Sequence, residues 1–346
     1  MHYHHRPIFI FGCPRSGTSL LSRIIDFHPQ ITIPFESHLY NTFYPWLEYY
    51  GDLNVPTNRQ RLVKDILSTE VLKSWEPRLN KQQILAGIER NDFHGIVESV
   101  MSEWTKVQGK QRWGEKTPQH VFYWREILQA FPDMQVIHIV RDGRDVALSW
   151  KKARFGPKHI YHLAKRWVCY TDKVEELKAN LNADAFLEVK YEDLLSNSEL
   201  VTKDICDFLG EDFTPQMLDF HTKGKSYPTD KTNQKNLSRP LMTNNIGKWR
   251  KQMSDRQLRI FEAVAGKTLE HYGYKRFLSK PRMSALEAKF CCYIEHPPRK
   301  IIAMAKNRQG YLDALSRLCI YLRLRWGFLT KRLKPSKVMR SGFPSA

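Results

Sequence analysis

An eight-residue loop between a strand-like run and a helix-like run constrains this chain most. The loop, Gly12–Ser19, follows the apolar run Pro7–Phe11 and precedes the run Leu20–Asp26. Glycines bracket the turn, so the backbone N–H groups of the turn and of the helix N-terminus can converge on one anion. The order of strand, turn and helix therefore predicts a phosphate-binding loop.

The loop lacks the lysine of the nucleotide triphosphatase motif. That motif reads G-x-x-x-x-G-K-[ST], whereas Thr18 occupies the lysine position here and Arg15 brings a cation inside the loop. We therefore predict a site that binds an oxyanion without the Lys and Mg²⁺ that hold the β- and γ-phosphates in an ATPase.

The rest of the chain predicts an α/β fold, with a P-loop-type parallel β-sheet flanked by helices. Strand-like and helix-like runs alternate, as a parallel sheet requires. The expected strands are Ile8–Phe11, Ile31–Pro34, Gln135–Val140 and Phe186–Lys190, and the expected helices include Leu20–Asp26, Val146–Lys152 and Leu200–Leu209. Residues 57–108 read as a helical insertion that shapes a cleft. A capping box at Ser254–Gln257 predicts a further helix.

The positive charge is concentrated in the last part of the chain. The net charge is +19, and from Lys280 onward fifteen Lys and Arg residues stand against three acids, a net charge of +12. We therefore expect a catalytic domain in residues 1–279 and a basic helical tail in residues 280–346. The charge of the tail favours an anionic membrane surface, rather than a nucleic acid, as its partner.

The tail also carries an apolar stripe with helical spacing. Its members recur three and four residues apart: Leu312, Leu315, Cys319, Leu322, Trp326, Leu329 and Leu333. The stripe could pack on the catalytic domain, join two copies into a homodimer or lie in a membrane interface. Three heptads are short for an isolated coiled coil, so docking or interface binding is favoured.

A second anion-binding signal follows the expected strand Gln135–Val140. That strand delivers Arg141 to its carboxyl end, where ligands bind in open α/β sheets. Ser149 comes two turns along the next helix, on the side of the helix start. A guanidinium and a hydroxyl in this arrangement can hold a second phosphate.

These two blocks resemble the sulfotransferases that use 3′-phosphoadenosine-5′-phosphosulfate (PAPS). The loop Pro14–Ser19 is similar to the P-R-S-G-T-[ST] loop of the protein-tyrosine and bacterial branches, and Arg141 and Ser149 match the family's 3′-phosphate block. The resemblance covers residues 7–277. It implies sulfuryl transfer from PAPS to a hydroxyl of a peptide tyrosine, a carbohydrate, a lipid or a small metabolite.

The resemblance also assigns roles to single residues. Glu36 falls at the position of the catalytic base, Arg15 would stabilise charge on the sulfuryl group, and Lys116 would neutralise the leaving phosphate. The residues expected to bind PAPS are Arg15, Ser16, Gly17, Thr18, Ser19, Arg141, Ser149, Tyr191, Lys248 and Trp249. For Tyr191 and Trp249 a role in the core is an equal alternative. The family has a serine where this chain has Gly247, so no side-chain contact is expected there.

Sulfuryl transfer moves an anionic group in line between two oxygens, so positioning and fixed charge can suffice without a metal. His38 is a second candidate base near Glu36. Two other functions are consistent with parts of the sequence: a P-loop kinase, which would need the missing lysine and Mg²⁺, and a non-catalytic basic surface-binding protein. Six cysteines without paired spacing and an N-terminal apolar run too short for a signal peptide predict a cytoplasmic protein that can sit on a membrane surface.

Overall fold

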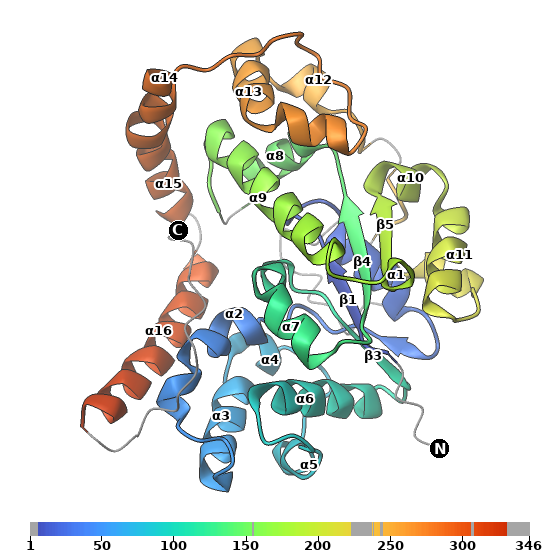
Figure 1. The fold of residues 1–346 in the computed structure, drawn as a ribbon, viewed down its shortest axis with the longest axis vertical. Helices are drawn as coiled ribbons and strands as arrows, with labels where there is room; N and C mark the ends of the chain where they lie inside the picture. The colour runs from blue at the N-terminus through green and yellow to red at the C-terminus, as the bar shows by residue number, and fades with distance from the viewer. Residues whose placement is uncertain are drawn as a thin grey trace.

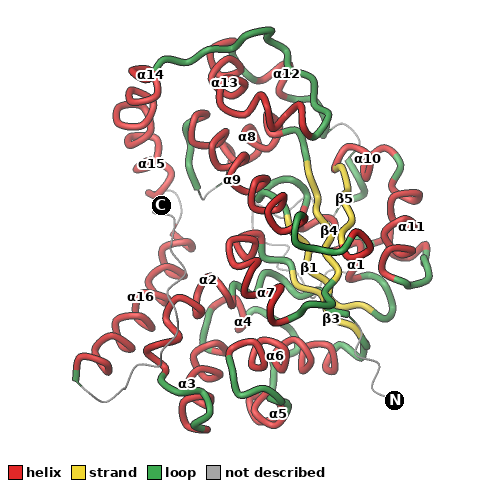
Figure 2. The backbone as a smooth tube through the Cα atoms, in the orientation of Figure 1, coloured by secondary structure: helices red, strands yellow, loops and turns green. Residues whose placement is uncertain are grey.

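A computed structural model describes residues 6–153, 156–222, 237, 239–242, 245–305 and 308–330. Its centre is a parallel sheet of five strands in the order β2-β3-β1-β4-β5. The strands are β1 Ile8–Phe11, β2 Ile31–Thr32, β3 Arg112–Glu115, β4 Gln135–Val140 and β5 Phe186–Lys190. Figure 1 and Figure 2 show the sheet in the middle of the molecule, with helices around it. The α/β fold with a parallel sheet is thus confirmed.

Helices connect the strands and surround the sheet. Those before β4 are α1 Thr18–Asp26, α2 Leu39–Phe43, η1 Tyr44–Tyr50, α3 Pro56–Leu67, α4 Glu70–Lys73, α5 Lys81–Ala86, α6 Phe93–Val107, η2 Pro118–Tyr123 and α7 Trp124–Ala130. Those up to residue 222 are α8 Gly143–Lys152, α9 Ile160–Lys178, η3 Ala183–Ala185, α10 Tyr191–Ser196, α11 Ser198–Leu209 and η4 Pro215–Asp219. Those after residue 245 are α12 Trp249–Gln252, α13 Asp255–His271, α14 Ala285–Phe290, η6 Cys291–Glu295, α15 His296–Ala305 and α16 Arg308–Leu329.

Local sequence explains where several helices begin. α13 begins with the predicted capping box, in which the Ser254 hydroxyl and the Gln257 side chain satisfy each other's backbone N–H groups. Asp92 caps α6, and Asp142 caps α8, each accepting a hydrogen bond from a backbone N–H. The predicted insertion contains α3 to α6, which lie together below the sheet in Figure 1.

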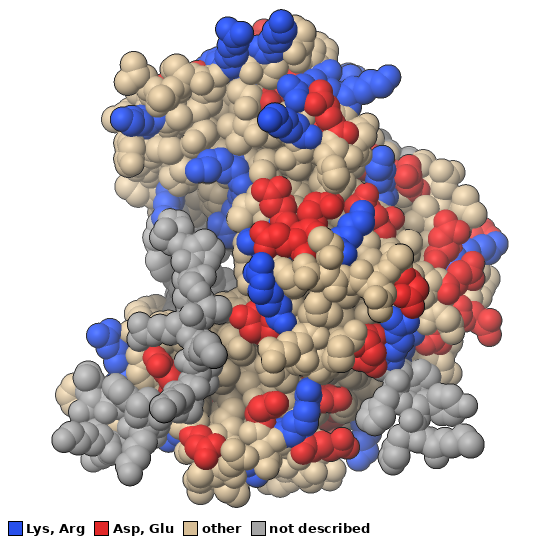
Figure 3. All heavy atoms as spheres, viewed as in Figure 1, with Lys and Arg blue, Asp and Glu red and all other residues tan. Residues whose placement is uncertain are grey.

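The C-terminal helices α14, α15 and α16 follow one another along one side of the molecule (Figure 1). In Figure 3, acidic side chains gather over α9 and α11, whereas the surface over α14 and α15 is mainly uncharged or basic. Leu333 and the side chains of Leu312 and Leu329 lie outside the described part of the chain. No helix in the described residues is both long and apolar enough to cross a membrane.

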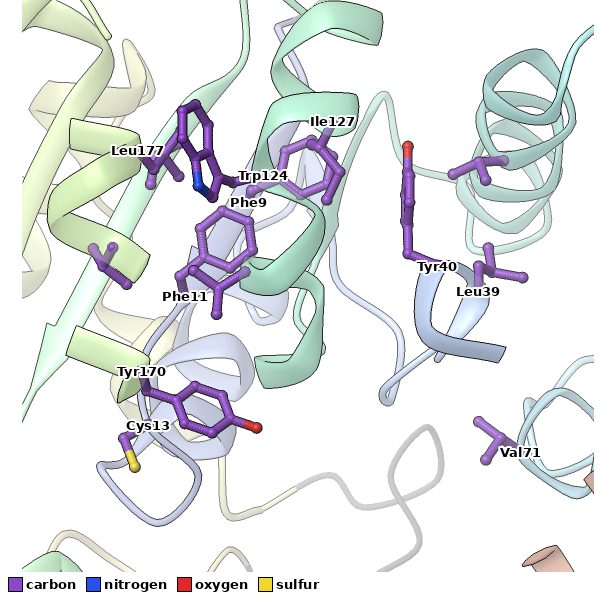
Figure 4. Close-up of a cluster of buried hydrophobic side chains, with 14 of the residues drawn as sticks. Phe9, Phe11, Cys13, Leu39, Tyr40, Val71, Trp124, Ile127, Tyr170 and Leu177 are labelled. Atoms are coloured by element: carbon purple, nitrogen blue, oxygen red, sulfur yellow. The ribbon is translucent and has the colours of Figure 1, made fainter. Parts of the chain in front are cut away.

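The sheet separates two apolar clusters because side chains alternate along each strand. Phe9 and Phe11 of β1 face the first cluster, with α7, α9 and the helical insertion, while Ile8 and Ile10 face the second, with α1, α10 and α11. Figure 4 shows part of the first cluster, where Phe9 and Phe11 lie among Trp124, Ile127 and Tyr170. Burial on both faces fixes the carboxyl ends of β1 and β4 side by side, which brings the loops after them together.

Candidate active site

A cavity of about 570 Å³ opens beside the carboxyl ends of β1, β4 and β5. The residues that follow these strands line it: Arg15 after β1, Arg141 after β4 and Tyr191 after β5. The segment Arg239–Met242 together with Asn245 and Lys248 closes another side. Its volume is within the range of ordinary cofactor and substrate pockets.

The loop after β1 has the backbone of an anion-binding turn. Arg15 has φ +79° and Gly17 has φ +103°, both in the left-handed region, and α1 begins directly afterwards at Thr18. A Cβ atom on Gly17 would lie 2.4 Å from Cδ2 of Tyr191, so glycine is required by conformation and by space. The first N–H groups of α1 therefore face the cavity floor, which Gly17, Thr18 and Ser19 help to form.

Buried polar atoms in this region have unused hydrogen-bonding capacity. Within the described residues, Ser16 Oγ and Arg141 Nε are buried and have no hydrogen-bond partner. Such atoms are costly unless a ligand satisfies them. Their position in the loop and at the end of β4 fits a ligand with two anionic groups.

Two arginines approach each other at this point. Arg15 Nε donates to Ser149 Oγ at 3.1 Å, and Arg141 Nη1 donates to the carbonyl oxygen of Arg15 at 3.3 Å. Burial and the nearby Arg141 lower the pKa of Arg15. An anion between these side chains would relieve both the desolvation and the repulsion.

Tyr191 forms the wall next to Arg141. The Arg141 guanidinium lies 4.3 Å from the centre of the Tyr191 ring, and the Tyr191 hydroxyl accepts a hydrogen bond from Asn245 Nδ2 at 2.7 Å. Arg141 Nη2 also donates to the Asn245 carbonyl oxygen at 2.7 Å. Tyr191 thus contributes both to the core and to the cavity wall.

Glu36 and Lys116 form an ion pair at the edge of the cavity. Lys116 Nζ lies 2.7 Å from Glu36 Oε1 and 3.1 Å from Ser19 Oγ, and His38 Nε2 lies 3.3 Å from Glu36 Oε2. Burial would raise the pKa of Glu36, but Lys116 and His38 outweigh it and hold this pKa well below its ordinary value. The structure therefore brings two of the three predicted catalytic groups, Glu36 and Lys116, into contact, together with the second candidate base, His38.

Glu115 positions the loops that carry this pair, a role for which the sequence offered only its place next to Lys116. Its carboxylate accepts hydrogen bonds from Ser37 Oγ at 2.7 Å and from Thr117 Oγ1 at 2.6 Å, and it lies 3.0 Å from His120 Nδ1. Burial would raise the pKa of Glu115, but these partners, His120 first, lower it to about 2. Ser37 and Thr117 are the neighbours of Glu36 and Lys116, so one buried carboxylate ties the two segments together.

Asp145 positions the segment around Lys248. It accepts hydrogen bonds from the backbone N–H groups of Gly247 at 2.6 Å and Trp249 at 2.9 Å. Lys248 consequently lines the cavity, whereas Trp249 is absent from the lining and packs against Leu148 and the Arg144 guanidinium. The predicted contact between Trp249 and a cofactor stays a prediction.

Sequence reasoning missed two cations of the cavity, Lys152 and Arg239, and the positioning residue Asp145. Lys152 ends the helix that was predicted to hold Ser149, so its helical spacing from that residue was a usable signal. Arg239 lies in a segment outside the helices and strands, and no motif in the sequence singles it out.

The fold and the site define an α/β protein whose loop after β1 contains Arg15 and has Thr18 where the nucleotide triphosphatase motif has its lysine. Comparison with protein-family models matches residues 7–215 to the Sulfotransferase family. The chain therefore belongs to this family, which confirms the resemblance that the loop and the Arg141 block predicted.

The chain is similar to several known proteins in this family. A protein-tyrosine sulfotransferase of Drosophila melanogaster is 23% identical over 286 residues, which cover 79% of this chain and 52% of that protein. Sulfotransferase 2A6 of Rattus norvegicus is 29% identical over 155 residues, which cover 38% of this chain and 55% of that protein. The chain thus spans about half the length of each of these relatives.

The fold also has a counterpart among solved structures. A sulfotransferase domain from the Synechococcus PCC 7002 olefin synthase superposes with a TM-score of 0.51 at 22% identity, covering 76% of this chain and 96% of that domain. This likeness concerns the arrangement of the elements.

Proposed function

We propose that this protein transfers the sulfuryl group of PAPS to a hydroxyl of an acceptor. Family membership supports the reaction class. The observation that carries the choice of donor is one cavity lined both by the loop after β1, through Arg15, Gly17, Thr18 and Ser19, and by Arg141 after β4. Arg141 Nε, and Ser16 Oγ in the same loop, are buried and have no hydrogen-bond partner. A donor with a phosphosulfate at one end and a 3′-phosphate at the other matches that arrangement.

PAPS would supply an activated sulfuryl group when bound. The loop amides with Ser16, Thr18 and Ser19 would hold its phosphosulfate, and Arg141 with Ser149 would hold its 3′-phosphate. Tyr191 and Lys248 line the same cavity and would contact the nucleoside part or its phosphates. Arg15, between the two ends, would balance charge on both.

Glu36 would act as the base that accepts the proton of the acceptor hydroxyl. It lines the cavity beside Phe35 and Pro118, whose apolar surfaces would limit access of water. Its ion pair with Lys116 keeps it ionised but makes it a weak base. We therefore propose that Lys116, which already contacts Ser19 of the loop, turns toward the donor's anionic group and releases Glu36 for proton transfer.

The choice of acceptor to test rests on the names of the relatives. The similarity to a protein-tyrosine sulfotransferase makes a tyrosine-containing peptide a first acceptor to test. Sugar, lipid and small-molecule hydroxyls are tested beside it.

One experiment separates the proposal from its alternatives. Thermal unfolding is measured with adenosine 3′,5′-bisphosphate, with ATP and Mg²⁺, and with buffer, and sulfate transfer is followed from radiolabelled PAPS into peptide, glycan and lipid fractions of a lysate. We expect stabilisation by the bisphosphate and label in one fraction. Stabilisation by ATP with Mg²⁺ alone would indicate a kinase, and no stabilisation with no label would indicate a non-catalytic protein.

A further inference from the structure

Exposed apolar side chains are concentrated in the C-terminal helices. Fourteen large apolar residues are exposed in the described part of the chain, and ten of them lie between Leu286 and Trp326. Scattered exposed apolar residues are ordinary, but such a concentration marks an interaction surface.

The helices α14, η6 and α15 contribute the first part of this surface. Its members are Leu286, Phe290, Tyr293, Ile294, Ile301 and Ile302, with exposed fractions from 49% to 79%. Most of them are spaced three, four or seven residues apart, so they share one side of the continuous helical segment. The opposite side contacts the catalytic domain, where Cys291 is completely buried.

The helix α16 is apolar on two opposite sides. Leu324 is buried, Tyr321 packs on Trp46 with ring centres 4.3 Å apart, and Arg323 pairs with Asp65, so this side is docked on η1 and α3. The other side presents Leu315, Leu318, Leu322 and Trp326, spaced three, four and four residues apart and exposed by 46% to 71%. The described members of the stripe predicted from the sequence, Leu315, Cys319, Leu322 and Trp326, are therefore exposed, and a different set of residues makes the docking contact.

Two acids of this region, Glu287 in α14 and Glu295 in η6, point inward. Glu287 pairs with Arg259 at 2.6 Å, and Glu295 pairs with Arg256 at 2.9 Å. Two arginines of α13 therefore neutralise these carboxylates. Lys289 and Lys300 are exposed, whereas Arg299 lies on the inner side, where it pairs with Glu295 at 3.7 Å. Figure 3 shows basic and uncharged atoms over α14 and α15.

We propose that the outer side of α14 to α16 binds the surface of an anionic lipid bilayer. Apolar side chains with exposed aromatic residues, Tyr293 and Trp326, beside lysine and arginine are the composition of interfacial helices. Residues 285–329 hold eight Lys and Arg against three acids, a net charge of +5. Self-association through the same side would therefore place like charges against each other, which an anionic bilayer avoids. The apolar faces enter the headgroup region without crossing the membrane.

Co-sedimentation of the full chain with vesicles tests this proposal. The vesicles contain phosphatidylcholine alone or with 30% phosphatidylserine, and the salt concentration is varied. We expect binding to the anionic vesicles that weakens with salt, because each exposed Lys or Arg near the surface contributes about 1 kcal/mol, or about fivefold in affinity. The double variant Leu322→Gln, Trp326→Gln should bind at least about tenfold more weakly, because its apolar groups no longer enter the bilayer.

Matched controls separate the surface from general effects. Leu200→Gln changes an exposed leucine of α11 and should bind like the wild type, whereas Lys289→Glu with Lys300→Glu should weaken binding and Lys106→Glu, on α6, should not. Thermal unfolding of every variant reports folding. Equal vesicle binding by the wild type and the tail variants would overturn the proposal. It would also be overturned if sedimentation velocity showed that Leu322→Gln, Trp326→Gln converts a dimer to a monomer while neither the wild type nor any variant binds vesicles.

Discussion

Lys116 Nζ lies 2.7 Å from Glu36 Oε1, so the cation predicted for the leaving group directly contacts the predicted base. A carboxylate with a buried ammonium partner loses basicity, and the pKa of Glu36 is accordingly low. Lys116 also contacts Ser19 in the phosphate-binding loop. An anion bound in that loop would compete with Glu36 for the lysine, and Glu36 would then regain basicity. In the proposed mechanism, donor binding and activation of the base would therefore be coupled through Lys116.

Glu36→Gln should reduce turnover strongly without weakening donor binding. The amide keeps a hydrogen-bond acceptor for Lys116 but cannot take the acceptor's proton, and a general base contributes about 10²- to 10⁴-fold. Steady-state sulfate transfer measures turnover, and calorimetric titration with adenosine 3′,5′-bisphosphate measures binding.

His38→Asn is the matched control for Glu36, since His38 contacts the same carboxylate. We expect a loss of less than about tenfold from weaker positioning. A large loss in His38→Asn combined with near-normal turnover in Glu36→Gln would make the histidine the base.

Arg141→Ala should remove the preference for a 3′-phosphate. The buried guanidinium lies on Tyr191 and has an unused Nε donor, and a charge-assisted hydrogen bond contributes about 1.5–3 kcal/mol, or about 10- to 100-fold. The ratio of affinities for adenosine 3′,5′-bisphosphate and adenosine 5′-monophosphate measures the effect. Arg250 lies on Trp249 and does not line the cavity, so the control variant Arg250→Ala should keep the wild-type ratio. An equal ratio in the wild type and both variants would show that Arg141 does not bind the 3′-phosphate.

The sequence predicted those elements whose local pattern and tertiary role agree. β1, β4 and β5 have the predicted bounds because their apolar runs are buried on both faces of the sheet or border it. β3 was missed because Arg112–Glu115 contains two charged residues and a glycine. Its arginine is buried by donating to the carbonyl oxygens of Arg6 and Leu209, each at 2.8 Å, and these partners are distant in sequence. The local sequence pattern cannot show that distant hydrogen-bond partners offset the cost of burying this arginine.

The site shows the same division. The phosphate-binding loop and Arg141 were predictable because each directly follows a recognisable strand. Arg239 was not, because its place in the cavity depends on the path of a long segment. The exposure of Leu315, Leu322 and Trp326 in α16 was also unpredictable, since Ile320 and Leu324 form a second apolar side of the same helix.

Glu115→Gln should destabilise the protein at neutral pH and remove part of its acid sensitivity. The pKa of Glu115 is about 2 in the folded protein and about 4.3 in an unfolded chain, so its stabilisation is present above about pH 4.3 and is lost as the pH falls toward 2. This shift corresponds to about 3 kcal/mol. Urea unfolding between pH 7 and pH 3 should show the wild type and the variant converging at acid pH.

An exposed glutamate provides the control for this titration. Glu199 pairs with Lys203 at 2.7 Å on the surface of α11, and surface pairs contribute about 0–1 kcal/mol. Glu199→Gln should therefore follow the wild type at every pH. A constant gap between wild type and Glu115→Gln from pH 7 to pH 3 would show that the carboxylate charge is not what stabilises these loops.

Lys248→Ala and Trp249→Leu should affect different properties. Lys248 lines the cavity, so its loss should weaken binding of adenosine 3′,5′-bisphosphate by about tenfold with little change in the free energy of unfolding. Trp249 is buried against Leu148 and Leu258, so Trp249→Leu should cost about 2–4 kcal/mol of stability and less in binding. Strong loss of donor affinity in a stable Trp249→Leu protein would instead support the cofactor contact that the resemblance implied.

Gly17→Ala should abolish donor binding and destabilise the protein more than Gly247→Ala. Both glycines have positive φ, +103° and +66°, so alanine strains the backbone at either position by about 1 kcal/mol or more. At Gly17 the new methyl group also meets the Tyr191 ring at 2.4 Å, whereas at Gly247 the nearest atom, Arg250 Nε, is 3.9 Å away. The difference between the two variants in urea unfolding and in bisphosphate titration therefore isolates the collision with Tyr191 from strain. Equal losses of stability and affinity in the two variants would mean that the loop and Tyr191 move apart at little energetic cost. The close approach of Gly17 to the Tyr191 ring would then not be needed for the phosphate-binding turn.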